Sequence, residues 1–131
     1  MITVLDASAA IKLALGQKEQ ETIAAVLKES DWVIVPSLYL YEVSNTLWKY
    51  YKSGYLELDN LKEVNVNCIR LTDEIVAANE IYEGAFNLAC KMNSSAYDMA
   101  YLEVCLRKKA GLLTFDKRLK DSAKDLDIEC C

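Results

Sequence analysis

The first residues of the chain read Met1-Ile-Thr-Val-Leu-Asp-Ala-Ser8, and this stretch decides the fold. Five uncharged, mostly apolar residues are typical of a buried β-strand, and the small residues after Asp6 lead into a helical pattern over residues 9–15 that ends at Gly16. A buried strand that runs directly into a helix is the first unit of an α/β sheet. In open parallel sheets the ligand site lies beyond the carboxyl ends of the strands, so Asp6 is predicted to stand at such a site.

The rest of the chain continues this alternation of short apolar strands and amphipathic helices. It predicts an α/β fold: a single domain over residues 1–131 with a central parallel sheet of about four to five short strands, flanked by helices on both faces. The predicted strands cover residues 2–5, 32–35, 68–71 and 112–114, with a weak last strand at 126–129. The predicted helices cover residues 9–15, 19–28, 37–53, 56–67, 74–91, 95–109 and 116–124.

The composition excludes several classes of protein. Hydrophobic residues make up 53% of the 131 residues and charged residues 27%, which is typical of a globular domain and not of a disordered chain. No apolar run is long enough to span a membrane and the N-terminus lacks a signal-peptide pattern, so we expect a cytoplasmic protein with no membrane partner. The five cysteines lack the C-x-x-C spacing of zinc sites and are predicted to be reduced thiols.

The chain contains no histidine. This absence removes the usual general base, every Ser-His or Cys-His nucleophile and any His-ligated zinc site. The net charge of −5 argues against broad electrostatic attraction to nucleic acid. Basic runs at residues 107–109 and 117–120 leave two interpretations open, a basic rim around a phosphodiester site or solvated helix ends.

Four carboxylates are candidates for one acidic site, and all of them provide the oxygen ligands that Mg²⁺ or Mn²⁺ prefers. Each also has a simpler interpretation. Asp6 and Asp116 follow predicted strands and suit helix N-caps. Asp98 fits a capping box that begins at Ser95, although it shares a strip with residues that should face the core. Glu42 lies at the edge of an apolar helix face and is equally compatible with a solvated position.

Taken together and in order, four short motifs resemble the PIN-domain nucleases, and most closely the VapC-type toxins of toxin–antitoxin pairs. The resemblance covers nearly the whole chain. It is carried by Val4-Leu-Asp-Ala-Ser8, by Pro36-x-Leu38 followed by Glu42-Val and Asn45, by Tyr97-Asp98 with Ala100-Tyr-Leu102, and by Leu113-Thr-Phe-Asp-Lys-Arg-Leu119.

This resemblance implies a site and a set of partners. Asp6, Glu42, Asp98 and Asp116 match the acidic quartet that serves as catalytic and metal-binding residues, and Ser8, Asn45 and Thr114 match frequent supporting polar positions. It implies a Mg²⁺ or Mn²⁺ cofactor, cleavage of single-stranded RNA, a homodimer, and a small antitoxin protein that blocks the site. The net negative charge and the sparse arginine depart from many relatives.

Two other functions stay open on the residues alone. One is a catalytically inactive PIN-like domain that binds a partner protein through tyrosine-rich helices. The other is a Mg²⁺-dependent phosphoryl-transfer or receiver-like domain, which would need Lys12 or Lys117 to hold a phosphate.

For the dimer, the aromatic residues along the helix of Glu42 predict an interface formed by this helix and the one that follows it, with burial within one chain as the alternative. These aromatics are Tyr39, Tyr41, Trp48, Tyr50, Tyr51 and Tyr55.

Overall fold

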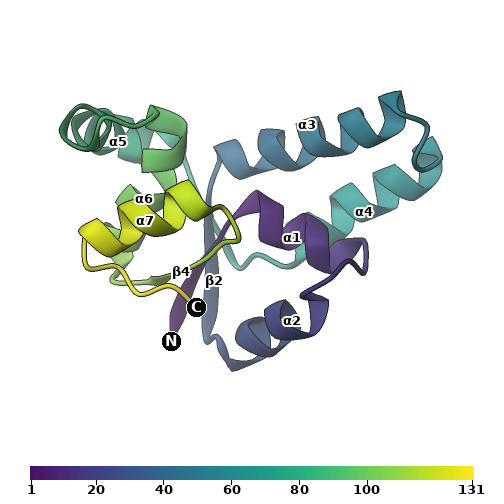
Figure 1. Ribbon diagram of the computed structural model, residues 1–131, viewed down its shortest axis with the longest axis horizontal. Helices are drawn as coiled ribbons and strands as arrows, with labels where there is room; N and C mark the ends of the chain where they lie inside the picture. Colours follow the sequence, from purple (N-terminus) through teal and green to yellow (C-terminus); the bar gives the residue numbers. More distant parts are fainter.

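A computed structural model describes residues 1–131. Its centre is one sheet of four parallel strands in the order β3-β2-β1-β4, which confirms the predicted α/β class (Figure 1). The strands are β1 (Ile2–Leu5), β2 (Trp32–Pro36), β3 (Glu74–Val76) and β4 (Gly111–Leu113). Because all four run in one direction, their carboxyl ends meet at the same edge of the sheet.

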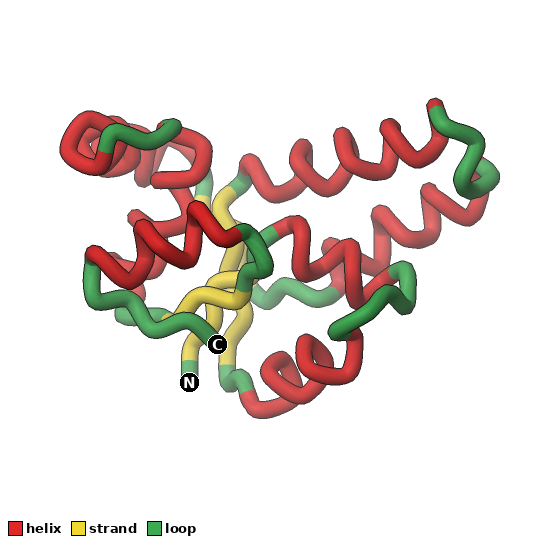
Figure 2. The backbone as a smooth tube through the Cα atoms, viewed as in Figure 1, coloured by secondary structure: helices red, strands yellow, loops and turns green.

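Seven helices surround this sheet. Figure 2 shows the sheet in the middle of the molecule, with α5, α6 and α7 to one side in this view and α1 to α4 to the other. The helices are α1 (Ala7–Ala14), α2 (Gln20–Glu29), α3 (Leu38–Lys52), α4 (Leu58–Arg70), α5 (Ala78–Met92), α6 (Ala96–Lys108) and α7 (Lys117–Asp125). None of them has both the length and the apolar character that a membrane-spanning helix needs.

Burial explains why the strands form where they do. Val33, Ile34 and Val35 of β2 are buried, as are Val4 and Leu5 of β1. Strands covered on both faces have no polar side, so continuous runs of branched apolar residues mark them in the sequence. Helix α6 packs on β1, β2 and β4 and buries six of its thirteen residues, which fixes its first turn beside the carboxyl ends of the strands.

The third predicted strand was wrong. Residues 68–70 form the last turn of α4, and the strand lies at Glu74–Val76, where the sequence predicted the start of a helix. A short apolar run does not by itself distinguish a strand from a buried helix end. The position of β3 is set by Asp73, whose N–H donates to the carbonyl of Val33 at 2.8 Å and whose carboxylate accepts the N–H of Val33 at 2.8 Å.

The weak last strand predicted at residues 126–129 was also wrong. Asp127 adopts a left-handed conformation with φ of 56°, and the N–H of Ile128 donates back to the carbonyl of Ala123. Only the last residues approach the sheet, through a single parallel bridge between Leu112 and Cys130. A left-handed residue cannot continue an extended strand, so the chain turns here and the sheet keeps four strands.

Candidate active site

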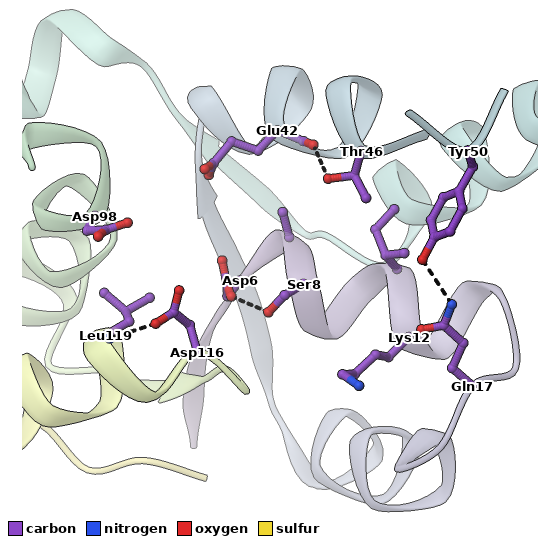
Figure 3. Close-up of a pocket in the computed structure, with 12 residues that line it drawn as sticks. Asp6, Ser8, Lys12, Gln17, Glu42, Thr46, Tyr50, Asp98, Asp116 and Leu119 are labelled. Carbon is purple, nitrogen blue, oxygen red and sulfur yellow. Dashed lines mark hydrogen bonds between the residues drawn. The ribbon is translucent and has the colours of Figure 1, made fainter. Parts of the chain in front are cut away.

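The four carboxylates singled out in the sequence line one pocket (Figure 3). Each comes from a different element: Asp6 from the end of β1, Glu42 from α3, Asp98 from α6, and Asp116 from the start of α7. The pocket has a volume of about 330 Å³ and lies at the carboxyl edge of the sheet. The common direction of the strands therefore brings together acids that lie far apart in the sequence, such as Asp6 and Asp116.

Asp6 is the most buried of the four, with 8% of its surface exposed. Its side chain makes no cap hydrogen bond to α1, so the interpretation of Asp6 as a simple helix cap was wrong. The carboxylate instead accepts the hydroxyl of Ser8 and, at 2.8 Å, the hydroxyl of Thr114. Burial raises the pKa of Asp6, the two hydroxyls oppose that shift, and the charge of Asp116 adds to it.

Glu42 is held by a residue that the sequence did not identify as part of the site. The hydroxyl of Tyr101 donates to Oε1 of Glu42 at 2.7 Å, although Tyr101 itself is almost completely buried. Burial raises the pKa of Glu42, the hydrogen bond from Tyr101 lowers it, and the charges of Asp6 and Asp98 raise it further. A buried tyrosine hydroxyl needs a partner, and this rule is the signal that would have pointed to Tyr101.

Asp98 and Asp116 occupy helix N-termini as well as the pocket. Ser95 caps α6 by accepting the N–H of Asp98 at 3.1 Å, while the carboxylate of Asp98 lines the pocket. Asp116 caps α7 by accepting the N–H of Leu119 at 3.1 Å through Oδ1. The cap and the site interpretations of Asp116 are therefore both compatible with its position.

The supporting residues divide into two groups. Ser8 and Thr114 touch Asp6 directly, and Thr114 also accepts the N–H of Asp116 at 3.0 Å, so its hydroxyl links two of the four acids. Asn45 was expected beside them, but it is exposed and lines a neighbouring pocket. Thr46 lines the acidic pocket instead, with its hydroxyl donated to the carbonyl of Glu42 at 2.9 Å.

The basic residues near the pocket are largely engaged. Lys12 lines the pocket but forms an ion pair with Glu19 at 3.1 Å. Arg107 and Lys108 lie elsewhere and pair with Glu103 at 2.7 Å and Glu74 at 2.9 Å. The run at residues 107–109 therefore forms no rim around this pocket.

The donor set fits a hard divalent cation. It offers carboxylate and hydroxyl oxygens and neither nitrogen nor sulfur ligands, which is the choice of Mg²⁺ and Mn²⁺ sites. Burial is the main cause of the raised pKa values of Asp6 and Glu42, so a cation in the pocket would favour their ionised forms. In the present side-chain orientations no three acidic groups are placed to hold one ion, so binding requires the carboxylates to turn toward it.

Comparison with known proteins gives the family. The PIN domain matches residues 3–125, and the chain belongs to this family. It is 29% identical over 124 residues to Ribonuclease VapC3 of Pyrobaculum aerophilum, covering 92% of this chain and 94% of the relative.

Three solved structures share the fold. A protein from Pyrobaculum aerophilum superposes with a TM-score of 0.72 at 20% identity, over 93% of this chain and 79% of that one. VapC20 of Mycobacterium tuberculosis, a Sarcin-Ricin loop cleaving toxin, gives 0.68 at 16% identity, over 92% and 94% of the two chains. VapBC2 of Rickettsia felis, solved with a DNA fragment from its promoter, gives 0.65 at 12% identity, over 100% and 98%.

The burial of Asp6 predicts that its negative charge destabilises the metal-free protein. Asp6→Asn should raise the free energy of unfolding at pH 7 by about 1 kcal/mol, because it removes a buried charge and keeps an oxygen for Ser8 and Thr114. The carboxyl pKa is raised in the folded state, so its ionisation opposes folding at pH values above that pKa. The gain should therefore vanish as the pH falls below the unfolded pKa of about 3.9.

Thermal unfolding with and without Mn²⁺ measures this effect. Mn²⁺ should raise the midpoint of the wild type and have much less effect on Asp6→Asn. Asp121→Asn, an exposed change on α7, is the control and should behave like the wild type. A destabilised Asp6→Asn variant, or equal metal effects in all three proteins, would contradict the site.

Proposed function

We propose that this protein is a metal-dependent endoribonuclease that hydrolyses single-stranded RNA and is the toxin of a toxin–antitoxin pair. The observation that carries the proposal is the pocket at the carboxyl edge of a PIN-domain sheet, lined by Asp6, Glu42, Asp98 and Asp116. The name of its relative, Ribonuclease VapC3, supports the activity, and the VapBC2 structure supports an antitoxin as partner.

The residues of the pocket have separate tasks in this proposal. Asp6, Asp98 and Asp116 would hold Mg²⁺ or Mn²⁺, and Glu42 would act as a further ligand or orient the attacking water. The bound ion would lower the pKa of that water and neutralise charge on the phosphate. Ser8 and Thr114 both donate to Oδ2 of Asp6 and fix its orientation. Tyr101 fixes Glu42 and favours its ionised form.

Neither rival function gains support. A receiver-like domain would need a free lysine for its phosphate, but Lys12 is paired with Glu19, and Lys117 is exposed at the start of α7 outside the pocket lining. An inactive interaction domain has no reason to keep Asp6 buried at the cost of its desolvation. Hydrolysis of RNA explains the pocket with fewer assumptions.

A nuclease assay tests the activity. Asp6→Asn, Asp98→Asn and Asp116→Asn should each lower the rate of single-stranded RNA cleavage by about 100-fold or more, since metal ions contribute several kcal/mol to transition-state stabilisation. EDTA should abolish cleavage, and Mg²⁺ or Mn²⁺ should restore it with 5′-phosphate and 3′-hydroxyl ends. Asp121→Asn should cleave like the wild type. Full activity of the pure protein in EDTA would contradict the metal mechanism.

The hydrogen bond from Tyr101 predicts a pH effect. Tyr101→Phe removes the one contact that lowers the pKa of Glu42, so the carboxyl should need a higher pH to ionise. The acid limb of the profile of kcat/KM against pH should move to higher pH, with activity at alkaline pH reduced only a few-fold. The exposed Tyr82→Phe is the control. An unchanged acid limb, or one moved to lower pH, would show that Glu42 does not set it.

A homodimer is part of the proposal, with fewer aromatic residues in its interface than the sequence predicted. Tyr39 is fully buried and Tyr50 partly buried, so neither belongs to an exposed surface. Trp48 and Tyr51 keep about half of their surface exposed and, with Leu58, line a groove between α3 and α4 of about 410 Å³. Helices α1 and α4 pack against other parts of α3 within one chain.

Sedimentation at micromolar concentration tests the dimer. The wild type should sediment as a dimer, and replacing Trp48 and Tyr51 by serine should give a folded monomer, because the exposed apolar surface is then lost. Replacing Tyr82 and Phe86, which are exposed on α5, by serine is the matched control and should leave the dimer intact. A monomeric wild type would contradict the dimer and leave the nuclease proposal in place.

A further inference from the structure

A second pocket adjoins the acidic one and has a different character. It is formed between the first turns of α3 and α6, with a volume of about 590 Å³, and Glu42 lines both pockets. The other residues that line it are Leu38, Tyr41, Ser44, Asn45 and Tyr97. A ligand bound at the acidic pocket can therefore extend directly into this second pocket.

Two exposed tyrosines are adjacent in sequence to the acids. Tyr41 precedes Glu42 on α3 and Tyr97 precedes Asp98 on α6, and their surfaces are 81% and 72% exposed. Tyr39 and Tyr101, by contrast, are buried and hydrogen-bonded. A single exposed aromatic residue needs no explanation. Two from different helices that line one pocket beside an acidic site offer ring faces to a flat ligand.

The polar group available in this pocket is Asn45. The hydroxyl of Ser44 already donates to the carbonyl of Leu40 at 2.8 Å and lies 3.1 Å from the amide nitrogen of Asn65. Asn45 is exposed, and its amide carries both donors and an acceptor, the pattern needed to pair with the edge of a base. Asn45 does not line the acidic pocket, but in this second pocket its amide can contact a ligand.

Charge restricts how this protein can bind RNA. The chain has a net charge of −5, Lys12 is the basic residue that lines the acidic pocket and is paired with Glu19, and no basic residue lines the second pocket. Binding that depends on neutralised phosphates is correspondingly weak. Stacking of a base on an aromatic ring needs no positive charge and tolerates any base. It also requires the base to be unpaired, which selects single strands.

We propose that this second pocket is a nucleobase subsite, in which Tyr41 and Tyr97 stack an unpaired base of the RNA next to the phosphate that is cleaved. Asn45 pairs with the edge of that base and sets a preference for its identity. The subsite rests on the proposed ribonuclease function, since it positions the substrate of that reaction.

Binding without turnover tests the subsite. The probe is a short single-stranded RNA that carries 2-aminopurine, a base whose fluorescence falls when it stacks, and Asp6→Asn serves as the background that does not cleave it. Tyr41→Ala and Tyr97→Ala should each weaken binding by about 5- to 150-fold and restore the fluorescence of the probe. Tyr41→Phe and Tyr97→Phe keep the ring and should bind like the background, and so should Tyr82→Ala, which lies outside the pocket. Asn45→Ala should change which base is preferred.

Cleavage kinetics in the otherwise native protein complete the test. Each alanine change should raise KM and leave kcat nearly constant, whereas loss of a catalytic group lowers kcat. A wild type that cleaves RNA, with affinity and KM indifferent to both alanine changes, would overturn the subsite and leave the ribonuclease in place. Tyrosine-dependent binding by a protein that cleaves no RNA with any divalent metal would keep the subsite and overturn the activity. Binding to no single-stranded RNA would overturn the subsite whatever the activity.

The same variants are sedimented to detect a second copy of the chain in this pocket. A wild-type dimer that dissociates in Tyr41→Ala and Tyr97→Ala, with no change in RNA affinity, would assign the pocket to the partner subunit. That result would overturn the subsite. An unchanged oligomeric state together with weaker binding supports it.

Discussion

The geometry of the site depends on a buried carboxylate at the end of β1, one of the two inner strands of the sheet. Asp6 follows β1, the second strand from the β4 edge and the one whose pairing joins β2 to β4. Burial of an ionised group costs free energy unless it is compensated. The hydroxyls of Ser8 and Thr114 offset part of this cost here, one from α1 and one from the residue after β4. The pairing of β1 with β4 therefore also brings the hydroxyl of Thr114 within hydrogen-bond distance of the Asp6 carboxylate.

The second constraint is the contact between α3 and α6. Tyr101 and Glu42 are 59 residues apart in sequence, and their 2.7 Å hydrogen bond connects the two helices at the carboxyl edge of the sheet. Helix α6 is fixed by its packing on β1, β2 and β4, so the orientation of Glu42 is ultimately set by the sheet. The same packing places Asp98, one turn before Tyr101, at the pocket. The first turns of α6 therefore contribute both to the core, through Tyr101, and to the pocket, through Asp98.

Much of this arrangement could be predicted from local patterns. Strands β1, β2 and β4 are continuous apolar runs, and three of the four acids follow strands or begin helices, where strand direction alone brings them together. The misplaced third strand depended instead on Asp73, whose two hydrogen bonds to Val33 span 40 residues. The pocket that Asn45 lines could not be predicted, because helical spacing gives the face of a residue but not which of two adjoining pockets it lines. Contacts over long sequence distances leave little trace in local periodicity.

The distribution of charge around the pocket supports the proposed cation. Lys12, the basic residue that lines the pocket, is paired with Glu19, and the ammonium of Lys120 lies over the ring of Phe115 at 5.2 Å from its centroid. No basic side chain lowers the pKa of Asp6 or Glu42, and burial raises both. A site that destabilises the free protein in this way is expected where binding energy is used for function. A cation bound at this pocket, as proposed, would favour the ionised carboxylates and stabilise the fold, so occupancy of the site and stability of the domain would be linked.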